Sequence, residues 1–308
     1  MIDRRDGRGG ECRHPAMEKD VTRQTVPLRP LLAPGRLLVA PGVFDMISAR
    51  LADRLGFAAL YMTGYGTVAS SLGLPDAGLA SYTEMVGRVA TIAGGTSASL
   101  IADADTGFGG LLNVERTVRG YEAAGAAAIQ IEDQVFPKKC GHTPGRQVIP
   151  AEDMAKKIRV ACETRDSADF LVIARTDART AHGIDEALRR AEAYARAGAD
   201  ILFVESPESE AEMRRICASL ERPCLANMVE GGRTPVLPSA TLIEIGYQVA
   251  IFPATAFLAA AQAMQRAYAA LHAHGSSAGQ DLDLFAFAEM NRLMGFEQVW
   301  AFERRHAE

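Results

Sequence analysis

Eight short apolar runs, separated by stretches with helical spacing, limit the fold of this chain more than any other feature. Each run is nearly continuous in apolar residues, as expected for parallel strands that are buried on both faces. The runs are Leu37–Ala40, Ala58–Met62, Ser99–Ala102, Ala127–Ile131, Leu171–Ala174, Asp200–Val204, Cys224–Ala226 and Val249–Phe252. The helical stretches between them are Asp45–Leu55, Thr83–Ala93, Val114–Ala124, Ala151–Thr164, Asp185–Ala197, Glu208–Leu220 and Ala240–Ile245. This alternation predicts a closed (β/α)₈ TIM barrel, with a doubly wound open sheet as the alternative.

Two further helical stretches follow the eighth run, at Thr255–His272 and Phe285–Arg304. A barrel needs neither of them, so we expect them to pack on a neighbouring subunit of a homo-oligomer, a dimer or a tetramer. The linker between them, His274–Asp283, contains small and polar residues that allow such an excursion. Residues 1–26 are predicted to be a disordered tail, and residues 27–308 the barrel domain with its C-terminal helices.

Composition excludes several classes of protein. The 308 residues carry a net charge of −5, which argues against a general nucleic-acid-binding protein. No apolar run approaches the roughly 20 residues needed to cross a bilayer, and the N-terminus lacks the apolar segment of a secretory signal. The five cysteines are scattered and odd in number, which is typical of a reducing compartment. We therefore predict a cytoplasmic protein with no membrane or nucleic-acid partner.

Polar side chains gather directly after the predicted strands. They are Thr63 to Gly66 after the second strand, Asp103 and Asp105 after the third, Glu132 and Asp133 after the fourth, Arg175 and Asp177 after the fifth, Glu205 after the sixth and Asn227 after the seventh. In a barrel these strand ends share one mouth, where active sites lie. Strand ends are exposed and collect polar residues in any case, but that does not explain carboxylates at three successive ends together with an arginine. We therefore predict an active site at this mouth.

The acidic residues at the mouth predict a metal site. Asp103 and Asp105 lie two apart, so on an extended strand end they would point the same way, and Glu132 follows the next strand. Such an oxygen-rich cluster suits Mg²⁺, with Mn²⁺ as a substitute. The alternative is that one of the two aspartates caps the following helix. Arg175 suits bidentate capture of a substrate carboxylate, or a salt bridge to Glu205 or Asp177.

A cysteine lies in a Pro- and Gly-rich loop after the fourth strand, within the sequence Lys-Lys-Cys-Gly-His at positions 138–142. The two lysines favour the Cys140 thiolate, and His142 adds to this effect when it is protonated. Cys140 is therefore a candidate acid–base group or nucleophile, although a loop thiol is often incidental.

With these residues in view, the chain resembles the isocitrate lyase/phosphoenolpyruvate mutase superfamily from about Leu37 to Arg304. The motifs that carry the resemblance are Tyr-Met-Thr-Gly-Tyr-Gly at 61–66, Ala-Asp-Ala-Asp-Thr-Gly-Phe-Gly at 102–109, Ile-Glu-Asp-Gln at 131–134, the loop at 138–142, Ala-Arg-Thr-Asp at 174–177 and Ala-Asn-Met-Val-Glu-Gly-Gly at 226–232. The resemblance implies a barrel whose terminal helix is exchanged between subunits, which would account for the additional C-terminal helices.

The resemblance also implies roles for individual residues. Asp103 would bind Mg²⁺, and Asp105 and Glu132 would hold its water shell. The substrate, a small dicarboxylate, would be bound by Thr63, Gly64, Tyr65, Gly141, Arg175 and Asn227. The catalytic residues would be Cys140, His142, Tyr61 and Glu205. Cys140 would protonate the leaving carbanion, as in the lyase branch, and either Tyr61 or Glu205 would be the base.

Two departures narrow the substrate. Isocitrate lyases carry Trp, and methylisocitrate lyases Gly, where this chain has Tyr65, and Leu258 stands where methylisocitrate lyases carry an Arg that holds a third carboxylate. The predicted function is Mg²⁺-dependent cleavage of a C–C bond in a 2-hydroxy dicarboxylate, such as a 2-alkylmalate, dimethylmalate or a methylisocitrate-like acid. The alternatives are oxaloacetate hydrolysis or decarboxylation, a phosphonomutase, and a non-catalytic binding barrel.

Overall fold

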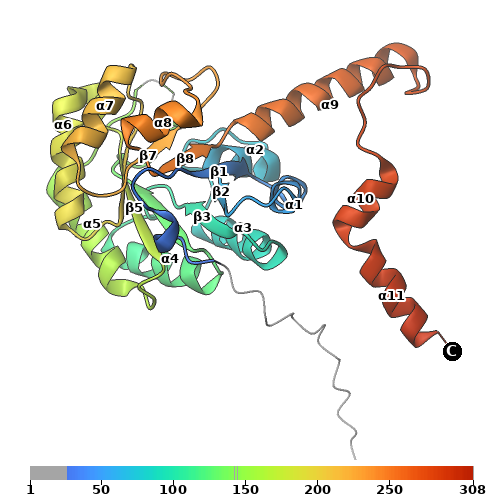
Figure 1. Ribbon diagram of the computed structural model, residues 1–308, viewed down its shortest axis with the longest axis horizontal. Coiled ribbons are helices and arrows are strands. Elements are labelled where there is room, and N and C mark those ends of the chain that lie inside the picture. Colours follow the sequence, from blue (N-terminus) through green and yellow to red (C-terminus); the bar gives the residue numbers. More distant parts are fainter. Residues whose placement is uncertain (1–25, 142, 144, 308) are drawn as a thin grey trace, which may run out of the picture.

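The computed structural model describes residues 26–141, 143 and 145–307, and its core is a closed parallel barrel (Figure 1). The strand order is β6-β5-β4-β3-β2-β1-β8-β7, and every pairing is parallel. A parallel bridge between Leu202 in β6 and Cys224, directly before β7, closes the ring. The closed barrel is confirmed and the open-sheet alternative is excluded. The predicted tail, residues 1–26, lies outside the described residues except for Val26.

The eight strands are β1 (Leu38–Val43), β2 (Ala59–Met62), β3 (Ser99–Asp103), β4 (Ala128–Glu132), β5 (Leu171–Thr176), β6 (Ile201–Val204), β7 (Leu225–Asn227) and β8 (Val249–Phe252). The helices around the barrel are α1 (Met46–Arg54), α2 (Gly64–Leu72), α3 (Tyr82–Gly95), α4 (Leu111–Ala123), α5 (Ala151–Thr164), α6 (Ala178–Arg196), α7 (Glu210–Ser219) and α8 (Ser239–Ile245). The C-terminal helices are α9 (Thr255–His274), α10 (Phe287–Met294) and α11 (Phe296–His306).

All eight predicted strands are present, and the helices differ from the prediction in two places. Helix α2, which begins at Gly64 with Thr63 at its N-cap, was not predicted. The stretch Phe285–Arg304 was expected to be one helix, but Gly295, with a φ of 88°, separates α10 from α11. A left-handed residue cannot continue an α-helix, so the chain turns there.

Each barrel strand alternates between two apolar layers, because successive side chains of a strand point to opposite faces. One layer, which includes Tyr61, Ile101 and Ile173, fills the barrel interior. The intervening residues, such as Met62, Ala102 and Val172, belong to the larger cluster that the surrounding helices cover. The same alternation continues to the strand ends, so it decides which polar residues point into the mouth.

The C-terminal helices form an arm, residues 255–306, that leaves the barrel. Helix α9 runs away from it, and the chain then turns back into α10 and α11 (Figure 1). Helix α10 touches α1 of the same chain, where Arg50 donates to the Leu293 carbonyl at 2.9 Å and Arg54 pairs with Glu289 at 3.2 Å. None of the helices in the described part of the chain is long and apolar enough to span a bilayer.

Candidate active site

The mouth at the C-terminal ends of the strands holds a pocket of about 540 Å³, counting its opening. Polar side chains from six successive strands reach this mouth: Thr63, Asp103, Glu132, Arg175, Glu205 and Asn227, and all six are buried. Each lies two residues beyond an interior-facing residue of its strand, for example Asp103 after Ile101 and Glu205 after Phe203. The pocket is also lined by Tyr61, Tyr65, Asp76, Lys138, Lys139, Cys140, Gly141, Val229, Ile251, Pro253, Ala254 and Phe257.

Asp103 and Asp105 face the same space, although not for the predicted reason. Asp105 lies past the strand with a φ of 49°, and its N–H donates to Asp103 Oδ1 at 3.0 Å, so the chain turns there instead of staying extended. Both carboxylates lie beside Gly64, where a Cβ would sit 2.5 Å from Asp103 Oδ2. The helix-cap alternative is wrong, because α4 begins after Gly110.

Lys138 forms a buried ion-pair cluster that the sequence did not indicate. Its ammonium lies 2.7 Å from Asp105 and 2.5 Å from Asp76, which comes from the segment between α2 and α3. Burial lowers the pKa of Lys138, but Asp105, Glu132 and Asp76 outweigh this effect and hold the pKa well above its usual value. Lys138 therefore stays charged and anchors the segment that carries Cys140.

Burial raises the pKa of three carboxyl groups at the mouth. The pKa of Glu132 lies well above its usual value because of burial, and Arg175 opposes this only in part. Burial also raises the pKa of Asp103, and it raises that of Asp105 to about 6 despite the Lys138 ammonium. The neighbouring positive charges are thus too few to stabilise all three carboxylates in their ionised forms.

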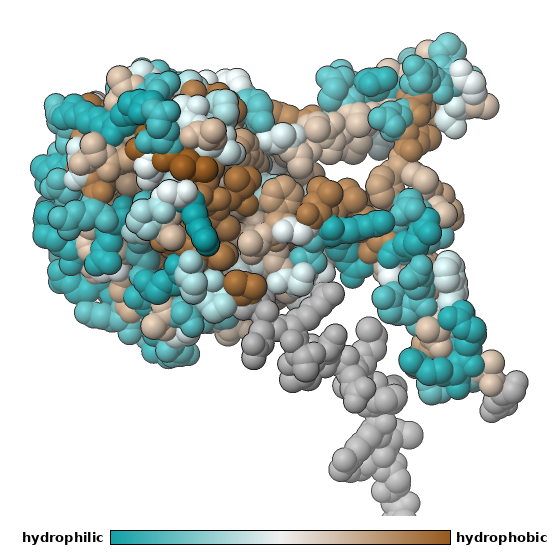
Figure 2. Space-filling model, viewed as in Figure 1, coloured by the Kyte–Doolittle hydropathy of each residue, from teal (hydrophilic) through white to brown (hydrophobic). Residues whose placement is uncertain are grey.

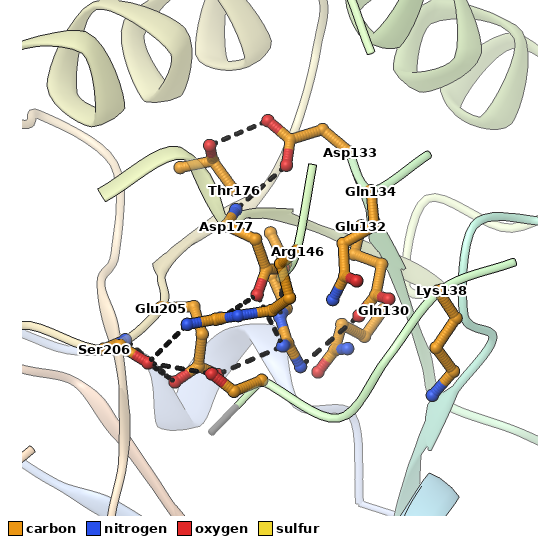
Figure 3. A network of polar contacts seen from close by, with 12 residues as sticks. Gln130, Glu132, Asp133, Gln134, Lys138, Arg146, Thr176, Asp177, Glu205 and Ser206 are labelled. Atoms are coloured by element: carbon orange, nitrogen blue, oxygen red, sulfur yellow. Dashed lines mark hydrogen bonds and ion pairs between the residues drawn. The ribbon is translucent and has the colours of Figure 1, made fainter. Parts of the chain in front are cut away.

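Arg175 is held rigidly at the centre of the mouth. Its Nε and one terminal nitrogen donate to the two oxygens of Asp177 at 2.9 Å each, and it approaches Glu132 and Glu205 at 3.4 Å. Figure 3 follows the network from Ser206 through Arg146 and Asp177 to Thr176 and Asp133. The predicted salt bridges exist, and the guanidinium still lines the pocket with hydrogen-bond donors to spare.

Glu205 is oriented from two directions. Asn227 donates to Glu205 Oε2 at 3.0 Å, and the Ser206 N–H donates to Oε1 at 2.8 Å. The Ser206 hydroxyl lies 3.0 Å from both Glu205 Oε1 and the Gly141 carbonyl oxygen. Gly141 approaches so closely that a Cβ there would contact Arg175 and lie 2.9 Å from Glu205 Cδ. The predicted residues Gly141, Arg175 and Asn227 therefore all lie against Glu205.

Tyr61 belongs to a hydrogen-bonded chain that ends at Asp103. The Tyr61 hydroxyl donates to Gln130 Oε1 at 2.7 Å, and Gln130 Nε2 donates to Asp103 Oδ1 at 3.3 Å. Burial and the nearby Asp103 carboxylate raise the pKa of Tyr61 well above its ordinary value. A tyrosine in this state is a hydrogen-bond donor.

Cys140 lines the pocket and is half-buried. Its backbone N–H donates to the Asp76 carbonyl at 3.1 Å, and its carbonyl accepts from Thr143 N at 3.0 Å. Of the two lysines expected to favour its thiolate, Lys138 is directed at Asp76 and Asp105. His142 lies outside the described residues.

One wall of the pocket is apolar, with Tyr65, Val229, Ile251, Pro253 and Phe257. The rings of Tyr65 and Phe257 pack against each other with their centroids 5.3 Å apart. The sequence comparison had singled out Leu258 as the position facing a third carboxylate. In the single chain Leu258 is 45% exposed and is not part of the lining, whereas its neighbour Phe257 is.

The carboxylates of the mouth could hold a divalent cation. No three His, Cys, Asp or Glu side chains within residues 26–141, 143 and 145–307 are close enough to hold an ion by themselves. Mg²⁺, however, commonly binds one or two carboxylates and keeps several waters. Glu132 Oε1 is buried without a hydrogen-bond partner, so this oxygen is available to a further ligand. Asp103 and Glu132 therefore fit a hydrated Mg²⁺ ion.

Several contributors to the site were missed by the sequence reasoning. Asp76 and Arg146 lie far from any strand end in sequence, and Phe257 lies in the first turn of α9, so no local pattern marks them. Gln130 could have been found, because it is a polar residue inside the apolar run of β4. Ser206 could have been suspected only from its place directly after Glu205.

A barrel whose mouth combines buried carboxylates, a fixed arginine and a half-buried cysteine is the architecture of an enzyme. Residues 28–272 match the family model described as phosphoenolpyruvate phosphomutase. The chain is 51% identical over 280 residues to 2,3-dimethylmalate lyase of Eubacterium barkeri, covering 91% of this chain and 97% of that protein. The chain therefore belongs to the phosphoenolpyruvate mutase/isocitrate lyase superfamily.

Two solved structures are similar over nearly the whole chain. One is oxaloacetate acetylhydrolase in complex with the inhibitor 3,3-difluorooxalacetate, with a TM-score of 0.85 and 35% identity, covering 90% of this chain and 95% of that one. The other is phosphonopyruvate hydrolase in complex with oxalate and Mg²⁺, with a TM-score of 0.82 and 32% identity, covering 92% of this chain and 98% of that one. Both share the barrel fold.

Proposed function

We propose that this enzyme is a Mg²⁺-dependent carbon–carbon lyase that cleaves a 2-hydroxy dicarboxylate with an apolar substituent, of the 2-alkylmalate or 2,3-dimethylmalate type. The observation that carries the proposal is that Cys140, Arg175 and Glu205 line one pocket with an apolar wall. Arg175 would bind a carboxylate, the wall would bind the alkyl group, and the thiol and the carboxylate would handle protons. The relative at 51% identity is named as a lyase of such an acid.

The excess of acidic over basic side chains at the mouth supports the binding of a divalent cation there. Among the described residues that line the pocket, the acids are Asp76, Asp103, Glu132 and Glu205, and the bases are Lys138, Lys139 and Arg175, with Asp105 paired to Lys138 beside them. A substrate with two carboxylates adds further negative charge to this largely buried site, where uncompensated charge is costly. A divalent cation held by Asp103 and Glu132, with Asp105 holding its water shell, would restore the balance. Mn²⁺ would be able to replace Mg²⁺.

The reaction needs one proton removed and one delivered. Bound at the mouth, Mg²⁺ supplies Lewis acidity that stabilises negative charge on the substrate's 2-oxygen. Glu205 takes the 2-hydroxyl proton, the C2–C3 bond breaks and the carbonyl of a 2-oxo acid forms. The bonding electron pair stays on the departing carboxylate fragment. The Cys140 thiol then donates its proton to that carbon.

Glu205 is the better candidate for the base than Tyr61. The pKa of Tyr61 lies well above its usual value because of burial, so its hydroxyl keeps its proton and donates to Gln130. Glu205 lines the pocket as a carboxylate whose direction Asn227 and Ser206 set. Thr63, Gly64, Tyr65 and Gly141 would shape the substrate site through their backbone and side-chain groups.

A second candidate, cleavage of oxaloacetate, is favoured by the likeness to oxaloacetate acetylhydrolase. The apolar wall formed by Tyr65 and Phe257 argues for the first candidate, because oxaloacetate has no alkyl group to fill it. The deciding experiment measures product release from 2-alkylmalates, 2,3-dimethylmalate, methylisocitrate, oxaloacetate and phosphonopyruvate, with EDTA-treated enzyme and Asp103→Ala as controls. Turnover only of oxaloacetate, or full activity without metal, would reject the proposal.

We further propose that the enzyme is a homo-oligomer, a dimer or tetramer, in which the arm packs on another subunit. Eleven large apolar side chains of the arm are exposed in the single chain, including Tyr268, Phe287 and Trp300. Figure 2 shows brown, hydrophobic surface along parts of the arm. Apolar surface on this scale marks an interface. A monomer in light scattering at micromolar concentration would contradict this.

The scattered, odd-numbered cysteines support the cytoplasm as the location.

A further inference from the structure

Ser206 has a backbone conformation that is unusual for its type. Ser206 directly follows Glu205, just beyond the end of β6. It is completely buried and has a φ of 59°. A serine in this left-handed region is strained, and such residues persist where the surrounding contacts hold them. The strained conformation brings the hydroxyl to within hydrogen-bond distance of two acceptors at once.

The two acceptors belong to different segments of the chain. Glu205 Oε1 lies at the end of the sixth strand, and the Gly141 carbonyl lies in the segment that carries Cys140, each 3.0 Å from Ser206 Oγ. A hydroxyl has one proton, so it donates to one of the two at a time. Because Glu205 Oε1 already accepts the Ser206 N–H at 2.8 Å, the hydroxyl proton is available to the Gly141 carbonyl. Arg146 donates to the same hydroxyl oxygen at 3.5 Å.

Two other side chains anchor this segment on either side of Cys140 and Gly141. Lys138 ties the segment to Asp76 and Asp105 on one side, and Arg146 ties it to Asp177 and Thr180 on the other. Between these anchors, Ser206 bonds both the Gly141 backbone and Glu205. It therefore acts between the two groups that the proposed reaction uses for proton transfer.

We infer that Ser206 is a positioning residue: its hydroxyl donates to the Gly141 carbonyl while its N–H donates to Glu205 Oε1, which fixes the Cys140–Gly141 backbone relative to the Glu205 carboxylate. The expected effect on kcat rests on the proposed function, whereas the expected release of the backbone beside Cys140 rests on geometry alone. Loss of the hydroxyl leaves both groups present but releases the backbone beside Cys140. Substrate binding through Arg175 is unaffected, so the effect falls on kcat.

The test compares Ser206→Ala and Ser206→Gly, both of which remove the hydroxyl. Glycine adopts a positive φ without strain, so only the glycine variant relieves the backbone. We expect both to lower kcat by on the order of 10- to 100-fold, as a misplaced catalytic group does, with KM changed less than about threefold. Ser209→Ala is the matched control, because Ser209 caps α7 and contacts neither Gly141 nor Glu205.

A second readout does not depend on the reaction. The rate of Cys140 alkylation by iodoacetamide, followed by peptide mass spectrometry on ligand-free enzyme, should rise about 2- to 10-fold in both Ser206 variants, the range expected for one lost hydrogen bond. It should stay unchanged in Ser209→Ala. Unchanged alkylation in folded variants, or activity restored by glycine but not by alanine, overturns the inference. If no lyase substrate is turned over by the wild type, the proposed function fails while the alkylation result still decides the role of Ser206.

Discussion

Gly141→Ala tests how closely the Cys140 segment must approach the mouth. The new Cβ would contact the Arg175 guanidinium and lie 2.9 Å from Glu205 Cδ and 3.0 Å from Glu205 Oε2. Neither side chain can move freely, because Arg175 donates twice to Asp177 and Glu205 accepts from Asn227 and Ser206. Overpacking a tightly filled site costs about 1 to 3 kcal/mol.

This free-energy cost arises only when Gly141, Arg175 and Glu205 are all in place around the pocket, as the reaction requires. It should therefore lower kcat/KM. A free energy of about 1 to 3 kcal/mol corresponds to a loss of about 5- to 150-fold. The assay is steady-state cleavage of the best substrate from the panel. Thermal unfolding should change little, because the segment can move outward to relieve the contact.

Gly87→Ala is the matched control for this substitution. Gly87 lies on an exposed face of α3, and a Cβ there has no atom within 4 Å. It should leave kcat/KM unchanged and add up to about 1 kcal/mol of stability, since alanine is the better helix former. A Gly141→Ala enzyme with kcat/KM within about twofold of wild type would refute the close approach as a requirement.

Four further outcomes are expected. Cys140→Ser should lower kcat by roughly 10²- to 10⁴-fold with little change in KM, since a hydroxyl is a much weaker acid than a thiol, and wild-type kcat would exclude Cys140 as the acid. Phe257→Ala should reduce the preference for 2-ethylmalate over malate, as the ratio of their kcat/KM values, by about 3- to 10-fold, and an unchanged ratio would remove Phe257 from the alkyl site. In the metal-free protein, burial raises the pKa of Asp105 to about 6, above its value in the unfolded chain. The folded state therefore loses stability as pH rises from about 4 to 6, where Asp105 must give up its proton. Mg²⁺ should accordingly raise Tm more at pH 7.5 than at pH 5, and equal shifts in Tm would contradict this. Lys138→Met should cost about 3 to 5 kcal/mol in urea unfolding, because it leaves buried carboxylates unpaired, whereas Lys156→Met at an exposed pair should cost under about 1 kcal/mol.

Two matched substitutions check the first two of these outcomes. Cys162→Ser removes a thiol on α5, away from the pocket lining, and should leave kcat unchanged. Leu258→Ala changes the exposed neighbour of Phe257 and should leave the substrate preference unchanged. A loss of selectivity in Leu258→Ala equal to that in Phe257→Ala would point to the packing of α9 in place of a direct contact.

The sequence alone determined the barrel and most of its mouth. Continuous apolar runs are typical of parallel strands covered on both faces, and their alternation with helices favoured a closed barrel over a doubly wound sheet. Because the strand ends of a barrel share one mouth, the polar residues directly after each run could be read as site residues. Asp103, Glu132, Arg175, Glu205 and Asn227 were found in this way.

Only the tertiary structure decided how these groups are held and what surrounds them. The Lys138–Asp76 pair joins residues 62 positions apart, and the Arg146–Asp177 pair joins residues 31 apart. The bridge from Ser206 to Gly141 spans 65 positions. Such contacts depend on where loops meet over the barrel, and no local periodicity encodes that. Burial likewise arises only from the assembled fold, and it raises the pKa of Glu132 and Tyr61.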